Sequence, residues 1–220
     1  MNGDDFLTVL QKRLGRRTDI TSAMVTLEAE MLRKNVLENA TFKPWFLQAE
    51  DATITTTASQ EYVSRPADFV HFDEEDDWCQ IAYNDPDDTS ADPWVPIVLD
   101  DWNIIKAYYK DEVIGKPIKG ALVFNRLYLR PIPDDTYTLR WRYYKTDSAF
   151  DFTVASENLW LQHASDWVLG EVGLIFASQY TRDQDVIPVF DLMRKEGRRR
   201  VYNETIARFE AGKMRSMGDD

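Results

Sequence analysis

The stretch LYLRPIPDDTYTLRWRYYK, residues 127–145, decides the fold of this chain. Apolar and polar side chains alternate on both sides of a central segment, residues 131–136, which contains two prolines and two aspartates. Alternation with period two is typical of a strand with one buried face, and two such strands around a turn-forming segment are typical of an antiparallel hairpin. We therefore expect residues 126–130 and 137–143 to pair as a hairpin that serves as scaffold.

The same alternation predicts which side chains of this segment face the core. On each strand the large apolar or aromatic residues fall on one side, opposite the arginines. Pro131 and Pro133 have no N–H to give to a neighbouring ladder, so they limit how far pairing can spread. The residues expected on the buried side are Leu127, Leu129, Tyr137, Leu139, Trp141 and Tyr143.

Helical patterns precede this β-rich region. Residues 4–14 predict a short helix, and a longer helix, capped by Thr18 or Asp19, extends to about residue 39. Apolar residues in the longer helix recur at steps of four, three and four, the spacing of one buried face. These residues are Ile20, Met24, Leu27 and Met31.

Helical patterns also follow the β-rich region. A helix is expected from residue 157 to about residue 180, and a last helix starts with Pro188 in its first turn, where proline is tolerated. Gly197 interrupts the last helix at a cost of about 1 kcal/mol relative to alanine. The apolar faces are predicted to contain Trp160, Trp167 or Val168, Val172 and Ile175 in the first helix, and Phe190, Met193, Val201, Ile206 and Phe209 in the last.

The order of helix, helix, sheet, helix, helix predicts an α+β fold, in which the terminal helices form a bundle and a central antiparallel β-sheet is inserted between them. Within the central region we expect strands at residues 51–59, 61–69 and 79–83, a short helix capped by Asp100, and strands again from Ala121. The predicted divisions are N-terminal bundle helices at 1–43, a β-rich domain with an acidic loop at 44–150, a bundle helix at 151–187, and a C-terminal helix and tail at 188–220.

Composition excludes several classes of protein. With 220 residues, 44% of them hydrophobic, the chain is long enough to bury a core without disulfides. Cys79 is the only cysteine, so neither an intrachain disulfide nor a cysteine-based zinc site is possible, and synthesis in a reducing cytoplasm is expected. Apolar runs are only a few residues long, so we expect no membrane span.

Charge is distributed unevenly along the chain, whose formal net charge is −12. Between residues 44 and 112, 17 acidic residues stand against three basic ones, whereas residues 188–220 contain eight basic and six acidic residues. General nucleic-acid binding requires cations that displace phosphate counterions, so the acidic balance argues against it.

Motifs for catalysis are weak, and the sequence predicts no enzyme and no cofactor. His71 and His163 both read as packed or surface histidines, and no nucleophile motif accompanies them. Residues 73–77 and 85–92 suggest calcium loops, but they lack the central glycine and terminal glutamate of that pattern, so a solvated acidic loop is expected. Paired carboxylates acting on cell-wall glycan remain an alternative.

Several segments together resemble the head-to-tail connector, or adaptor, family of tailed bacteriophages, which includes the tail tubular protein A type. They are EYVSRPADF, GKPIKGALVFNRLYLRPIP, YTLRWRYY and ENLWLQHASDWVLGEVGLIFASQY, in this order along nearly the whole chain. The acidic excursion at 73–92 and the cluster Arg198–Arg200 depart from the resemblance.

The resemblance implies a structural virion protein that is assembled in the host cytoplasm. It implies a ring of twelve copies beneath the portal protein, with a next tail or nozzle protein below it and double-stranded DNA passing through the centre without specific binding. A C-terminal segment that orders only against a partner would dock on the portal, and mixed aromatic, apolar and basic residues suit that role. The docking candidates are Arg198, Arg199, Arg200, Tyr202, Phe209 and Met214.

The acidic run suggests a second role in such a ring. Carboxylates on a channel wall repel DNA over a screening length of about 8 Å and let it slide, so part of this run is expected to line or rim the channel. An acidic outer surface that keeps the protein soluble is the alternative, and for the cluster Arg198–Arg200 the alternative is a solvated helix face. A regulatory binding module of cellular origin is a further alternative for the whole chain. The channel candidates are Asp73, Glu74, Glu75, Asp76 and Asp77.

Overall fold

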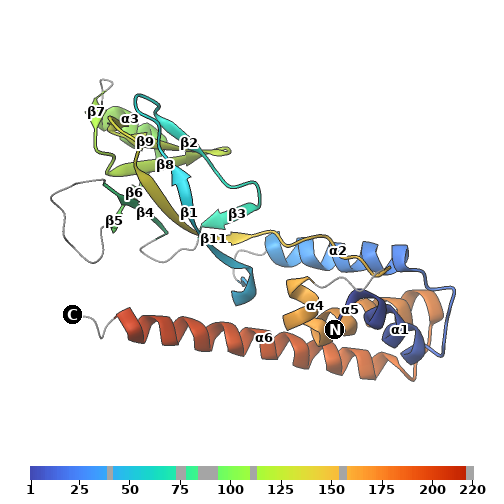
Figure 1. Ribbon diagram of the computed structural model, residues 1–220. Helices are drawn as coiled ribbons and strands as arrows, with labels where there is room; N and C mark the ends of the chain where they lie inside the picture. Colours follow the sequence, from blue (N-terminus) through green and yellow to red (C-terminus); the bar gives the residue numbers. More distant parts are fainter. Residues whose placement is uncertain (39–41, 73–77, 84–93, 110–112, 154–157, 217–220) are drawn as a thin grey trace. The chain divides into compact units, whose positions relative to one another are not determined.

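The computed structural model describes residues 1–38, 42–72, 78–83, 94–109, 113–153 and 158–216. The chain divides into two compact units, one formed by Met1–Leu47 with Thr146–Asp220 and the other by Gln48–Lys145. The first unit is helical and the second contains the described strands and a short helix (Figure 1). The predicted α+β class is therefore confirmed, with N-terminal and C-terminal helices packed together and antiparallel sheets between them in the sequence.

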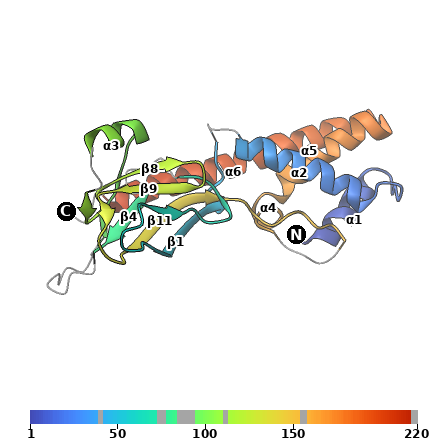
Figure 2. The same ribbon diagram turned by 90° about the horizontal axis from the view of Figure 1, so that it is seen from above.

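The helical unit is built around α5, which packs against α2 and along the first part of α6 (Figures 1 and 2). The expected single helix from 157 to 180 is broken at Ala164, but its end near residue 180 is confirmed, because Arg182 adopts a left-handed conformation with φ 53°. The elements of the unit are α1 (Gly3–Arg13), α2 (Ser22–Glu38), the 3-10 turn η1 (Trp45–Leu47), α4 (Leu159–His163), α5 (Ser165–Ile175), the π-helix η2 (Phe176–Thr181) and α6 (Ile187–Ser216).

Helix α2 begins later than predicted and buries a different face. The hydroxyl oxygen of Thr21 accepts a hydrogen bond from the backbone N–H of Met24 at 3.4 Å, so neither Thr18 nor Asp19 caps the helix. The predicted buried face is confirmed at Ile20, which is 2% exposed, but wrong at Leu27, 59% exposed, and at Met31, 46% exposed. The buried positions include Val25 and Ala29, which lie on the neighbouring side of the helix, so an apolar stripe is left open in the single chain.

Glycines allow α5 and α6 to approach closely. A Cβ atom on Gly170 would overlap the backbone of Arg194, and one on Gly173 would overlap the ring of Phe190. On the other helix, a Cβ atom on Gly197 would lie 2.5 Å from the backbone nitrogen of Trp167. Gly197 therefore does not interrupt α6, and its missing side chain is what permits the contact.

The β-rich unit contains two larger sheets and a small parallel pair. One sheet has the order β1-β11-β4-β5, with β3 also paired to β11, and the other has the order β2-β9-β8-β6. Asp101, rather than the predicted Asp100, caps α3 (Trp102–Tyr108) through its side chain. The strands are β1 (Gln48–Thr55), β2 (Tyr62–Ser64), β3 (Phe69–Phe72), β4 (Cys79–Ala82), β5 (Trp94–Pro96), β6 (Val98–Leu99), β7 (Ile114–Gly115), β8 (Lys119–Val123), β9 (Arg126–Arg130), β10 (Ile132–Pro133) and β11 (Thr138–Lys145).

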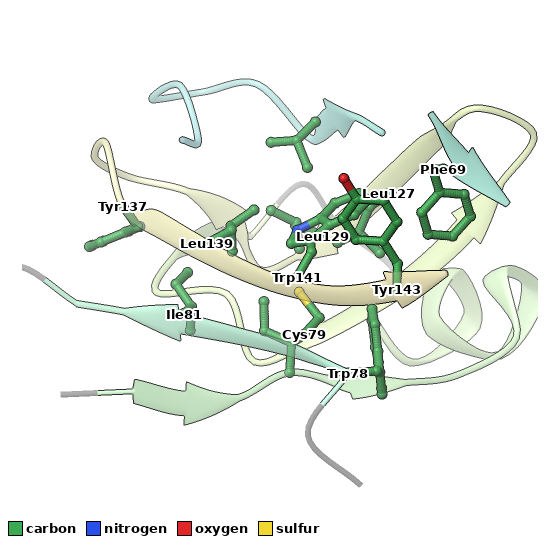
Figure 3. Close-up of a cluster of buried hydrophobic side chains, with 12 residues drawn as sticks. Phe69, Trp78, Cys79, Ile81, Leu127, Leu129, Tyr137, Leu139, Trp141 and Tyr143 are labelled. Carbon is green, nitrogen blue, oxygen red and sulfur yellow. The ribbon is translucent and has the colours of Figure 1, made fainter. Parts of the chain in front are cut away.

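The expected hairpin of β9 and β11 is wrong, although its buried faces are correct. β9 pairs with β8 and β2, whereas β11 pairs with β1, β3 and β4, so the two strands belong to different sheets. The intervening segment instead forms β10, which pairs with β7. All six side chains predicted on the buried faces enter one apolar core to which both sheets contribute (Figure 3).

We predict that Gly170→Ala destabilises the helical unit. Its new methyl group meets backbone rather than a mobile side chain, so the helices must separate, at a cost of about 3 kcal/mol. Thermal and urea unfolding measure this cost. Gly115→Ala is the matched control, because its Cβ atom would lie 3.6 Å from Pro131, an ordinary contact. Equal stability of Gly170→Ala and the unchanged protein would show that the helices do not cross this closely.

Candidate functional site

A groove of about 350 Å³ runs over α5 in the helical unit. One face of α5, with Trp167, Glu171 and Ile175 at helical spacing, forms its floor. Met31 of α2 lines one side, and Arg198 of α6 lies on the other. The open apolar stripe of α2 therefore continues directly into a hollow between helices.

The groove contains two acidic side chains, and one of them, Glu28, has no partner among the described residues. Glu28 of α2 is only 7% exposed, and among the described residues its carboxylate has no hydrogen-bond or ion-pair partner. Glu171 accepts a hydrogen bond from the indole N–H of Trp167 at 3.3 Å and lies 4.0 Å from Arg194. The Glu28 carboxylate oxygens are not among the fully buried polar atoms that lack a partner, so the group is only partly dehydrated, and a nearby cation would compensate that loss. The groove therefore favours an occupant that brings a cation.

A second hollow, of about 470 Å³, adjoins the groove at Phe42 and is basic. Its lining includes Lys195, Arg199 and Tyr202, and the rings of Phe42 and Tyr202 lie 5.5 Å apart between centroids. Lys195 donates a hydrogen bond to Asp191 of α6 at 2.6 Å and thereby lowers the pKa of Asp191. Aromatic rings beside exposed cations are typical of surfaces that bind partners.

The structure brings together only some of the predicted portal-docking residues. Arg198, Arg199 and Tyr202 meet around Phe42. Arg200 lies elsewhere, with its guanidinium 3.1 Å from the carboxylate of Asp166. Phe209 is half-buried, and the side chain of Met214 lies outside the described part of the chain.

Helix α6 continues beyond its last well-buried contact. The Thr205 hydroxyl accepts a hydrogen bond from the backbone N–H of Trp45 at 3.3 Å. The guanidinium of Arg208 lies over the Trp45 ring, 3.6 Å from its centroid. The backbone remains helical to Ser216. Ordering of this segment against a partner stays a prediction, to which the structure adds that the backbone of the stretch is helical.

Other predicted positions have simpler outcomes. The five channel candidates, Asp73, Glu74, Glu75, Asp76 and Asp77, lie outside the described residues. His163 is exposed, which is one of the two outcomes expected for it, and its ring lies 4.8 Å from that of Trp45. In the described ranges no group of three or more histidine, cysteine or acidic side chains could hold a metal ion. No helix in those ranges is long and apolar enough to cross a membrane.

Sequence reasoning missed Glu28 and Phe42. Glu28 lies in a helix for which other residues were predicted to form the buried face. Phe42 was considered only as part of the segment that ends that helix. A signal for Phe42 was present, because it is an aromatic residue two positions before Pro44, where a chain leaving a helix often packs back.

Comparison with known families gives a match over almost the whole chain. The model of the family described as SU10 adaptor protein matches residues 1–215. Among curated proteins, none matches this chain.

We predict that Glu28→Gln stabilises the isolated protein by about 1 kcal/mol, because the neutral amide loses less hydration in the groove than an unpaired carboxylate does. Chemical denaturation of the single chain measures the change. Glu30→Gln, two residues along the same helix, is the control and should destabilise, since Glu30 pairs with Arg33 and accepts a hydrogen bond from the Phe150 N–H at 2.8 Å. A loss of stability in both variants would mean that Glu28 already has a partner in the chain.

Proposed function

Because the chain belongs to the SU10 adaptor protein family, we propose that it forms a ring between the portal and the tail of a bacteriophage. The family gives it a structural, non-enzymatic role in the virion, in contact with other virion proteins. In the proposal, twelve copies form the ring, and double-stranded DNA passes through its centre without specific binding. This role is favoured over a cell-wall glycan hydrolase because the family is one of structural adaptors.

The observation that carries the proposal is the length of α6. Its 30 residues span about 45 Å, and of the side chains described after Thr205, Ile206 is 38% exposed and Phe209 is only half-buried. A helix end that packs little on its own chain is marginally stable in water. Such an end gains stability by docking on another protein, and the portal is the partner that we propose for it.

The two units divide the remaining contacts in this proposal. The helical unit, which contains residues 1–43 and 151–187, forms the body of the ring, and residues 188–220 reach the portal. The β-rich unit, Gln48–Lys145, which falls within the predicted domain 44–150, supports the next tail or nozzle protein in this proposal. Contact with the portal uses the basic and aromatic surface of Arg198, Arg199 and Tyr202 together with Arg200, Phe209 and Met214 of the same helix.

The acidic run at residues 73–77 lines or rims the channel in the same proposal. Five consecutive carboxylates would repel phosphates at short range. Cations in their place would hold the duplex and add friction to its passage. The run therefore suits a channel that releases DNA quickly.

We predict that a chain ending at Arg208 keeps its fold but no longer binds portal rings. A cut after Arg200 is less informative, because it would also remove Val201 and Thr205, which are buried. The cut after Arg208 retains both residues and the contact with Trp45. The mass of complexes formed with purified portal rings measures binding, and circular dichroism checks the fold. Undiminished binding by the folded, shortened chain would exclude this docking role.

We also predict that neutralising the acidic run, with Asp→Asn and Glu→Gln at residues 73–77, makes assembled rings retain linear DNA. Cosedimentation at low and physiological salt measures retention, which should weaken as salt rises. The control neutralises Asp183 and Asp185, which lie in the connection between η2 and α6. If the two neutralised proteins retain DNA equally, the run does not face the channel.

A further inference from the structure

We propose that the groove over α5 is a socket for a neighbouring copy of this chain, which inserts the exposed start of its α6, Val189 and Leu192, with Arg13 beside it. The inference rests on the proposed ring and identifies the surfaces by which its copies join. It commits to a second copy as the occupant because the helical unit itself carries the complementary surface.

The socket has a mixed lining, with apolar side chains, the carboxylates of Glu28 and Glu171, and Arg198 at its border. Met31 and Ile175 line it, and Leu27, 59% exposed, extends its apolar rim along α2. Glu28 is buried there without a cationic partner among the described residues. A well-fitting occupant would therefore present apolar side chains next to a cation.

The start of α6 has these properties. Val189 is 50% exposed and Leu192 is 59% exposed, although both belong to a helix that packs on α5. Arg13 lies at the same place, because its guanidinium is 2.6 Å from the sulfur of Met193. Arg13 is exposed, and in the described part of the chain it has no carboxylate partner. Two apolar residues beside an uncompensated cation complement the socket in both polarity and charge.

We call the inserted residues, Val189, Leu192 and Arg13, the plug. The geometry of α6 places the plug and the socket on opposite flanks of the helical unit. Val189 and Arg198 are nine residues apart in α6, which at about 100° per residue corresponds to opposite sides of the helix. Arg198 borders the socket, so Val189 points away from it. A contact between two different flanks of one subunit is heterologous, and repetition of such a contact closes a ring when the rotation allows it.

Disulfide trapping between copies tests the inference. Met31→Cys and Leu192→Cys are made in separate chains carrying tags of different size, mixed and mildly oxidised. Cys79 does not interfere, because it is fully buried and burial raises the pKa of its thiol. Mixed pairs should exceed both kinds of identical pair by at least about tenfold, since docking raises the effective concentration of the two thiols.

The matched control is Ile104→Cys in α3, a helical position 57% exposed, which should give no excess with either partner. A Met31→Cys chain that links mainly to itself would show a symmetric contact and overturn the inference. Equal linking to Ile104→Cys would show random collision and overturn it as well. Glu28→Gln in the socket chain should lower the yield of mixed pairs several-fold, and an unchanged yield would remove the role of the charge.

A second experiment separates this inference from the proposed function. Met31→Asp spoils only the socket and Leu192→Asp spoils only the plug, so neither variant should assemble alone, whereas their mixture should form one-to-one pairs and nothing larger. Each chain has a mass of 25.6 kDa, so light scattering resolves these species. Larger assemblies from either variant would overturn the inference. Binding of the unchanged protein to portal rings is measured separately, and its failure would instead contradict the proposed function.

Discussion

The closeness of α5 and α6 is the constraint on which the helical unit depends. Gly170 and Gly173 on one helix and Gly197 on the other leave no room for a Cβ atom where the helices meet. This contact fixes the direction of α6 over its first part. The positions of the side chains along the rest of α6 therefore depend on it. A helix that must present several surfaces accurately needs such a rigid base, because a small rotation would displace every surface residue along its length.

Much of the fold could be predicted because alternation and helical spacing report burial directly. The faces of β9 and β11 were predicted correctly, and so was the end of the helical region near residue 180. The pairing of β9 with β11 was not, because alternation shows which side of a strand is buried but not which strand lies beside it. Two strands that share a core from different sheets have the same pattern as two strands of a hairpin.

The error in α2 has a different origin and is more informative about function. Leu27 and Met31 show the spacing of a buried face, yet both are exposed in the single chain. A sequence records burial in whatever state the protein works in, including contacts with other subunits. Among the residues that line the two hollows, Arg198, Arg199 and Tyr202 stand out by composition, whereas Glu28 stands out only once its surroundings are known. The docking role of the first three stays a prediction.

A carboxylate without a partner in a groove and an apolar stripe left exposed beside it are costs that a self-sufficient globule would avoid. They become reasonable if the chain is stable enough alone to be made and stored, but reaches its lowest free energy only in an assembly. The costs lie apart from the packing that holds the chain together, because the glycine contact and the β core are formed within one copy, whereas Glu28 has no partner among the described residues. In the proposed ring, such a subunit would fold first and join later.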